Sequence, residues 1–378
     1  MANKKKVKNY SSFLNNSIDF TLLIVLLILL ALGLIMVLSA SSPKSLSDYG
    51  TSHHFFIRQL IFALLGLGAM MIISKIDYRF YQKFYKIAWL VSVVLLVLVL
   101  LIGTEVNNAT RWIKITESFS FQPSEIVKFL MIVFYAGILT RDRDELGNFW
   151  MGLVKHICML APIIVLLLLE PHFSVSIVIL GTCCIMMIMA GCKFWQFASA
   201  GISIGVPAIV GMVMMADYRL ARVTTFLNPW SDPTDSGWQI IQSLYAIGSG
   251  GLFGLGLGES NQKYLYLSEP QNDFIFAIIA EELGFVGCIF VIVLFAILIW
   301  RGILIAMKAP DMFGSLIAVG ITSLIAIQVI INIAVVTSSM PVTGMPLPFF
   351  SYGGTSLLIL LCEIGVLLNI SRAANSGT

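Results

Sequence analysis

The chain has 378 residues, of which 58% are apolar and 11% charged, and its mean hydropathy is +0.93. An ordinary soluble domain carries roughly 25% charged residues, so this composition excludes a soluble globular enzyme. The net charge of +3 is too small to indicate nucleic-acid binding. The uncharged runs 20–43, 171–192, 194–216 and 312–362 each exceed the roughly 18 residues that indicate a membrane-spanning helix. The sequence therefore predicts a polytopic membrane protein.

Ten membrane spans are predicted along the chain. They cover about residues 20–41, 55–74, 86–103, 124–140, 155–170, 173–191, 194–215, 274–300, 312–336 and 348–370. Each is a continuous apolar block, whereas a membrane β-barrel shows short alternating segments. The expected fold class is an all-α polytopic membrane protein with about ten transmembrane helices. No internal repeat is visible, so an inverted-repeat transporter architecture gains no support.

The distribution of Lys and Arg predicts the orientation. With the N-terminus inside, fifteen of the 23 residues lie in cytoplasmic segments, seven lie outside, and Lys128 lies within a span. Cytoplasmic loops carry the excess of positive residues, so we expect both termini in the cytoplasm. The chain is then one transmembrane domain, 1–378, with cytoplasmic tails at 1–19 and 371–378. The first apolar block lacks an A-x-A-like cleavage site, which favours a retained span over a signal peptide.

One connection is much longer than the others. Residues 216–272 form a predicted outer loop of 57 residues between the seventh and eighth spans, and loops of that length usually carry function or are disordered. Within it, residues 236–247 predict a short helix that lies on the membrane or packs against the bundle. The glycine-rich run 248–258 permits close backbone approach to a ligand, but it follows no strand, so it gives little support for a nucleotide site.

Asp273 lies where this loop enters the eighth span. We expect it to be either a helix N-cap, a role that Asn272 also suits, or a general base whose pKa is raised by apolar neighbours. Glu281 and Glu282 follow two turns deeper in an otherwise apolar segment. Eight residues are close to two helical turns, so Asp273 and Glu281 are expected on roughly the same face. The two glutamates form either a buried polar anchor between helices or part of a functional site.

A second set of charges surrounds the start of the fourth span. Glu125 and Lys128 are three residues apart, and an acid and a base at that spacing neutralise each other within a membrane. Pro123 just before them predicts a helix start. The preceding loop supplies Arg111 and Trp112. A helix N-terminus beside these residues favours a site for a pyrophosphate or a carboxylate.

Further basic residues on the same predicted side are Arg219, Arg222 and Lys263. They are expected either to bind substrate or to be solvated charges that contact lipid phosphates. The six Cys residues show no paired CxxC spacing, so neither a disulfide framework nor a zinc site is expected.

Residues 341–356, PVTGMPLPFFSYGGTS, interrupt the long uncharged run near the C-terminus. Their three prolines must break the helix. The segment is expected either to be a re-entrant lip over a cavity or to be a simple tight turn between two helices.

Four stretches resemble signatures of the SEDS family (shape, elongation, division and sporulation): FQPSEIVKF, NPWSDPTDSGWQIIQSLYAIGSGGLFGLGLGES, YLSEPQNDFIFAIIAEELGF and PLPFFSYGGTSLL. They occur in order over most of the chain and resemble the FtsW and SpoVE branch more than RodA. The resemblance implies ten transmembrane helices with a large extracellular loop between the seventh and eighth. It also implies polymerisation of lipid II into glycan strands with a class B penicillin-binding protein, a transpeptidase, and other membrane proteins of the divisome or elongasome.

By the same resemblance, the family's essential aspartate falls on Asp273. Glu125 and Lys128 match the polar pair of its QPSE segment, and Arg111 and Trp112 match the preceding loop. The family often reads PExHTDF before the aspartate, whereas this chain reads SEPQNDF, so a role for that His is not expected. No organic cofactor is implied, a divalent cation (Mg²⁺ or Mn²⁺) stays open, and no nucleic acid is expected.

The implied reaction is an inverting glycosyl transfer at the outer face of the bacterial cytoplasmic membrane. Asp273 would deprotonate the acceptor 4-hydroxyl, while Arg or Lys residues or a divalent cation stabilise the departing undecaprenyl pyrophosphate. Two alternatives stay open. A lipid II transporter would use the same intramembrane charges as a pathway, and a non-catalytic scaffold for a transpeptidase would need none of them.

Overall fold

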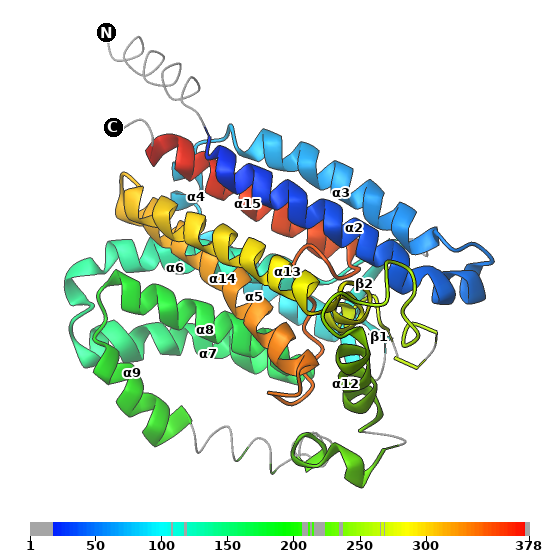
Figure 1. Cartoon of the computed structure of the whole chain (residues 1–378). Coiled ribbons are helices and arrows are strands. Elements are labelled where there is room, and N and C mark those ends of the chain that lie inside the picture. The colour runs from blue at the N-terminus through cyan, green and yellow to red at the C-terminus, as the bar shows by residue number, and fades with distance from the viewer. Residues whose placement is uncertain are drawn as a thin grey trace.

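The structure, a computed structural model, describes residues 18–106, 109–116, 119–205, 211, 214, 224–233, 237–264, 266–267 and 269–374. It is a bundle of long helices with one small sheet at one end (Figure 1). Within these residues, nine helices are long and apolar enough to cross a membrane. They are α2 (Phe20–Tyr49), α3 (His54–Ile73), α5 (Tyr85–Ile102), α6 (Pro123–Arg141), η2 with α7 (Phe149–Leu169), α8 (Phe173–Ala190), α13 (Ile275–Lys308), α14 (Met312–Val336) and α15 (Gly354–Ala374).

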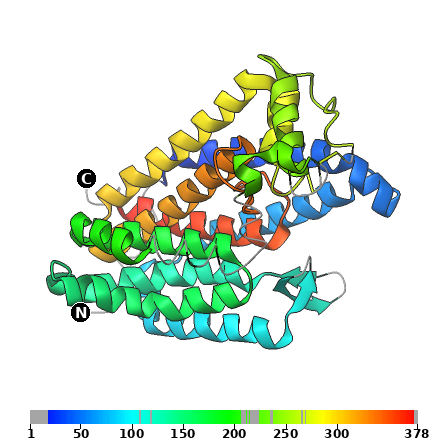
Figure 2. The ribbon, with the colours of Figure 1, turned by 90° about the horizontal axis from the view of Figure 1, so that it is seen from below.

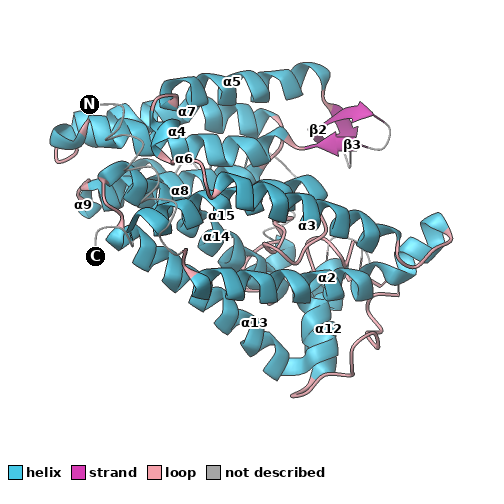
Figure 3. Cartoon of the chain, turned by 90° about the horizontal axis from the view of Figure 1, so that it is seen from above, coloured by secondary structure: helices cyan, strands magenta, loops and turns pink. Residues whose placement is uncertain are grey.

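The remaining elements are short. They are α4 (Arg79–Gln82), β1 (Thr104–Val106), β2 (Ala109–Thr116), β3 (Phe119–Phe121), η1 (Arg143–Glu145), α9 (Phe194–Ala200), η3 (Gly201–Gly205), η4 (Pro229–Ser231) and α12 (Trp238–Gly250). In the span 149–169, η2 covers Phe149–Val154 and α7 covers Lys155–Leu169. α12 runs across the long helices rather than along them (Figures 1 and 3). α12 confirms the short helix predicted at 236–247 over its described part, and residue 236 lies outside the described residues.

Nine of the ten predicted spans coincide with these helices. The predicted span 194–215 contains α9 and η3, and most of its remainder lies outside the described residues, as does part of the predicted loop 216–272. The predicted span 348–370 starts too early, because the helix begins only at Gly354. Prolines precede it, and Phe349 has φ +66, which is not helical. α15 continues to Ala374, so residues 371–374 of the predicted cytoplasmic tail are helical, and their place outside the membrane stays a prediction.

The start of α2 and the end of α15 lie at the same end of the bundle (Figure 1). Asp19 caps α2 by accepting a hydrogen bond from the N–H of Leu22 (2.9 Å), and its own N–H donates to Ser371 Oγ (3.1 Å). Arg301 of α13 donates to the same carboxylate through Nε (3.0 Å). This arrangement agrees with both termini being on one side of the membrane, and the assignment of that side to the cytoplasm stays a prediction.

The centre of the bundle is formed by α6, α14 and α15, whose side chains are mostly buried, whereas α3 and α5 expose apolar side chains at the periphery. Apolar side chains on the outside of a spanning bundle face lipid. α6 packs against α5, α8 and α14. Figure 2 places α5 (cyan) and α13 (yellow) at opposite edges of the bundle, with α14 (orange) between them.

A three-stranded antiparallel sheet connects α5 to α6. Thr104 pairs with Trp112, and Ile113 pairs with Phe121. The sequence predicted only an outer loop here, because β1 and β3, with three residues each, are too short to show an alternating pattern beside the single longer strand β2. The sheet carries Arg111 and Trp112 on β2 to the start of α6.

Candidate active site

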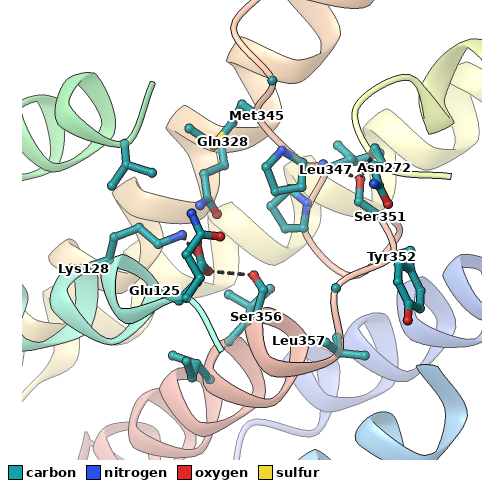
Figure 4. A pocket seen from close by; sticks show the side chains of 18 of the residues that line it. Glu125, Lys128, Asn272, Gln328, Met345, Leu347, Ser351, Tyr352, Ser356 and Leu357 are labelled. Carbon is teal, nitrogen blue, oxygen red and sulfur yellow. Dashed lines mark hydrogen bonds and ion pairs between the residues drawn. The ribbon is translucent and has the colours of Figure 1, made fainter. Parts of the chain in front are cut away.

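A cavity of about 200 Å³ is enclosed by β2, by α6, α14 and α15, and by the segments that precede α13 and α15. Five residues predicted from the sequence line it: Arg111, Trp112, Glu125, Lys128 and Asp273. It is also lined by Asn272, which the sequence suggested only as an N-cap, and by polar residues that were not singled out from the sequence: Gln122, His172, Gln328, Ser356 and Glu363. Figure 4 shows how segments far apart in the sequence share this site.

Glu125 and Lys128 form an ion pair inside the cavity wall. Pro123 is the first residue of α6, which places Glu125 in the first turn of the helix and Lys128 one turn later. Lys128 Nζ lies 2.9 Å from Glu125 Oε2, and the residues are 4% and 7% exposed. Ser356 Oγ of α15 donates to the same oxygen (2.6 Å; Figure 4). The predicted mutual neutralisation is confirmed.

Glu363 adds a second carboxylate to this end of the cavity. It lies on α15, is almost fully buried, and its Oε2 has no hydrogen-bond partner among the described residues. A buried polar atom without a partner in the protein is available to a ligand or to water. A weak signal for Glu363 is present in the sequence, because a charged residue within a membrane span is costly and indicates function.

Asp273 lines the cavity from the segment just before α13. The helix begins at Ile275, and its N-cap position is Phe274, which makes no side-chain capping bond. The interpretation of Asp273 or Asn272 as an N-cap is therefore wrong, because the chain is still in a turn at these residues. Asp273 lines the cavity from this turn.

The segment between α14 and α15 forms one wall of the cavity and is fastened to the Asp273 segment. Ser351 Oγ donates to the carbonyl of Asn272 (2.5 Å), and the N–H of Tyr352 donates to the carbonyl of Gln271 (2.8 Å). Figure 4 shows Ser351, Tyr352 and Asn272. Gly344 has φ +65, and a Cβ built on it would lie 3.3 Å from Asp273 Oδ2. The segment is thus a lip over the cavity, as one interpretation expected, and the simple-turn alternative is wrong.

Arg111 approaches the cavity from β2. Its guanidinium donates to the carbonyl oxygens of Glu170 and Pro171 in the turn between α7 and α8. These bonds tie β2 to the turn that contains Glu170 and Pro171. Arg111 and Trp112 both line the cavity.

His172 and Glu170 lie in that same turn, and sequence reasoning missed both. Burial, together with the charges of Arg111 and Lys128, lowers the pKa of His172 to about 3, so the imidazole is neutral at physiological pH. Its Nε2 lies 3.2 Å from Gln122 Nε2, and its Nδ1 has no hydrogen-bond partner among the described residues. Burial raises the pKa of Glu170 to about 8, although Arg111 opposes the shift.

Lys263 and Glu282 lie outside the cavity lining. Lys263 Nζ is 2.9 Å from Glu282 Oε1, and Ser39 Oγ of α2 donates to that oxygen (2.5 Å). The three side chains hold α2, α13 and the long connection together. This is the buried polar anchor that the sequence analysis gave as one alternative, and it is not shared with Asp273.

Glu281 is likewise remote from the cavity. It accepts hydrogen bonds from Ser260 Oγ (2.5 Å) and from the N–H of Asn261 (3.0 Å). The expectation that Glu281 shares a face with Asp273 is wrong, because Asp273 precedes the helix and the two-turn spacing does not apply. Arg219 and Arg222 lie outside the described residues. Among the residues that the structure does describe, no three His, Cys, Asp or Glu side chains form a metal-binding group.

The fold and this site define a polytopic helical membrane protein. Its charged cavity is covered by the lip between α14 and α15. The sequence matches the FTSW_RODA_SPOVE family model, described as cell cycle protein, over residues 20–376, and the chain belongs to this FtsW/RodA/SpoVE family. It is 48% identical over 356 residues to stage V sporulation protein E of Bacillus subtilis, covering 94% of this chain and 97% of that protein. It is 42% identical over 355 residues to the probable peptidoglycan glycosyltransferase FtsW of Trichlorobacter lovleyi, covering 93% of each.

Solved structures share the fold. One solved chain carries the description "Structural coordination of polymerization and crosslinking by a peptidoglycan synthase complex". Its TM-score with this chain is 0.80 and the two sequences are 27% identical, over 95% of this chain and 98% of the solved chain. The rod shape determining protein RodA of Thermus thermophilus gives a TM-score of 0.68 and 26% identity, covering 94% and 97%. The resemblance inferred from the motifs is confirmed.

Proposed function

We propose that this chain is a peptidoglycan glycosyltransferase that polymerises lipid II into glycan strands and releases undecaprenyl pyrophosphate. The observation that carries the proposal is that Asp273 lines the same buried cavity as Arg111 and the Glu125–Lys128 pair. A carboxylate to accept a proton and cations to stabilise a leaving anion are the two groups that an inverting glycosyl transfer needs. The name of the FtsW relative supports this assignment.

In the proposed reaction, Asp273 is the general base. It removes the proton from the 4-hydroxyl of the acceptor GlcNAc, and that oxygen attacks the anomeric carbon of the lipid-linked donor. The bond from this carbon to the pyrophosphate oxygen breaks with inversion, and the proton remains on Asp273 until solvent removes it. Arg111 attracts the departing pyrophosphate electrostatically, while Lys128 is held in place by Glu125.

The site is proposed to act on the outer face of the bacterial cytoplasmic membrane, with both termini in the cytoplasm. The excess of Lys and Arg in the opposite segments supports this orientation. A class B penicillin-binding protein is the proposed partner, and lipid II is the proposed substrate. The structural neighbour described as part of a peptidoglycan synthase complex supports a partner that crosslinks the strands.

The test is polymerisation of purified lipid II in detergent by the chain with its partner transpeptidase. We expect glycan from the native protein and a loss of about 10² to 10⁴ in rate for Asp273→Asn, which keeps the shape of the side chain but accepts no proton at neutral pH. Asp48→Asn is the matched control, because Asp48 is exposed and lies outside the cavity lining. A transporter or a scaffold makes no glycan in detergent, and full activity of Asp273→Asn would end the assignment of the base.

A further inference from the structure

The helix α13 is broken at Gly284, although it continues on both sides. Gly284 has φ +67 and ψ −168, which lies outside the helical region. Such a break removes hydrogen bonds of the helix, and within a bilayer the freed backbone groups must find partners in the protein. Here the freed groups lie immediately before and after Gly284.

The partners come from the glycine-rich segment that follows α12. Four backbone hydrogen bonds join the two segments, written donor first: Phe285 to Gly251 (2.9 Å), Val286 to Leu252 (3.1 Å), Leu255 to Glu281 (2.9 Å) and Gly256 to Glu282 (3.0 Å). Both segments donate two bonds and accept two. Residues 251–256 therefore pair with the broken helix much as a strand pairs with its neighbour.

Glycine is required at two positions where the paired segments approach closely. A Cβ on Gly254 would lie 2.1 Å from the carbonyl oxygen of Glu282, and a Cβ on Gly284 would lie 2.3 Å from the backbone nitrogen of Gly254. Both glycines also have positive φ, which side chains with a Cβ rarely adopt. The glycine-rich run thus serves contact between two parts of the chain, where the sequence analysis considered a ligand.

The break lies at the edge of the hydrocarbon region. Between Glu282 and Arg301, α13 has 18 uncharged residues, which at about 1.5 Å per residue span about 27 Å, close to the roughly 30 Å of a bilayer core. Gly284 is at the end of this stretch opposite Arg301. The paired segment 251–256 must lie at the same depth.

The side chains at the tip of that segment are apolar and exposed. Leu252 and Phe253 are 64% and 80% exposed, beside Phe285 and Val286 of α13, which are 60% and 52% exposed. The sequence 238–258 contains no charged residue. A contiguous apolar surface of this kind, adjoining the outward face of a spanning helix, is suited to acyl chains and not to water.

We propose that residues 251–256 form a re-entrant turn inserted into the acyl-chain region of one membrane leaflet, with Leu252 and Phe253 facing lipid. The turn is then part of the membrane-embedded surface and is not an aqueous loop. Four of its backbone groups are hydrogen-bonded to α13, and the N–H of Gly254 and the carbonyl of Gly256 are bonded to Gly250 and Glu259. Such pairing within the protein is what irregular structure at membrane depth needs. Glu281, which binds Ser260 and Asn261, fixes the chain where it leaves the membrane.

The test is the depth of a nitroxide attached at position 253. The full chain carries Phe253→Cys as its single Cys, in a background with the six native Cys replaced, and is reconstituted into nanodiscs of phosphatidylcholine and phosphatidylglycerol. Collision rates are measured with oxygen, which concentrates in hydrocarbon, and with a nickel chelate, which stays in water. Val293→Cys, 46% exposed on α13, is the lipid control, and Glu259→Cys is the aqueous control.

We expect the label at 253 to favour oxygen over the nickel chelate at least severalfold more than the label at 259 does, and to approach the ratio at 293. Leu252→Cys should behave in the same way and guards against a local effect of one label. Equal nickel accessibility at 253 and 259 would overturn the proposal. Protection from both reagents would also overturn it, because the turn would then be covered by protein.

Discussion

The side-chain amide of Asn332 donates to the backbone carbonyl of Asp273 at 2.9 Å. The same nitrogen donates to the carbonyl of Met345 at 2.7 Å, so one buried side chain of α14 joins the lip to the segment that carries the proposed base. Asn332 is not among the residues that line the cavity. It is a positioning residue, because it acts on the backbone and not on a substrate.

Replacing Asn332 with Leu should therefore misplace Asp273 and also reduce stability. Two backbone carbonyls lose their donor, and each buried unsatisfied group costs about 1 to 3 kcal/mol. We expect a lower unfolding temperature in detergent and a fall in kcat that exceeds any change in KM. Thr337→Val, at the exposed end of α14, is the control. Unchanged kcat in a folded Asn332→Leu protein would show that the bridge does not position the base.

Single and double substitutions of Glu125 and Lys128 distinguish a structural role of this ion pair from a catalytic one. Either single substitution, Glu125→Gln or Lys128→Met, leaves one buried charge uncompensated and should destabilise the protein by about 3 to 5 kcal/mol. The double variant removes both charges, so its unfolding temperature should recover while polymerisation stays low. Full activity in the double variant would reduce the pair to a structural element.

Gly344 tests how tightly the lip approaches Asp273. Gly344→Ala places a Cβ 3.3 Å from Asp273 Oδ2 in a residue with φ +65, and the left-handed conformation alone costs about 1 to 2 kcal/mol. Polymerisation should fall even where expression is normal. Gly68→Ala is the matched control, since its Cβ would meet nothing within 4 Å and its φ is not positive. Equal activity of the two variants would argue against a tight lip.

Glu170 should make stability depend on pH. Its folded pKa of about 8 exceeds the ordinary value of 4.5 because the carboxyl is buried, so the folded state binds its proton more tightly than the unfolded state does. The contribution of this proton to the free energy of unfolding is fully present below about pH 4.5 and is lost as pH rises toward 8. Glu170→Gln should gain stability relative to the native chain between pH 5 and 8, by on the order of a few kcal/mol. The measurement is the thermal unfolding of the native chain and of Glu170→Gln between pH 5 and 8. Glu259→Gln, at an exposed position, is the control.

The orientation is tested by labelling of single Cys residues in spheroplasts. In a background without native Cys, Glu259→Cys should react with an impermeant thiol reagent and Lys83→Cys should not. Both positions are exposed, so a lack of reaction reports the side of the membrane. The reverse pattern would place Asp273 in the cytoplasm and remove the proposed site from the outer face.

The sequence by itself determined the elements that depend on the bilayer or on near neighbours. A membrane accepts only continuous apolar helices, so uncharged runs predicted nine spans that the structure describes. The spacing of Glu125 and Lys128 was enough to predict their ion pair, because three residues form one helical turn. Three prolines predicted the break between α14 and α15 for an equally local reason.

Only the tertiary structure decided which charges meet. Asp273, Glu125 and Glu363 come from distant segments, and they line one cavity because α6, α14 and α15 pack at the centre of the bundle. Lys263 was a candidate substrate-binding residue in the sequence, yet it pairs with Glu282 of α13, outside the cavity lining. Asp273 precedes α13, which begins at Ile275, whereas Glu282 lies within the helix. A helical repeat cannot predict this separation, because the repeat holds only where the chain is a continuous helix.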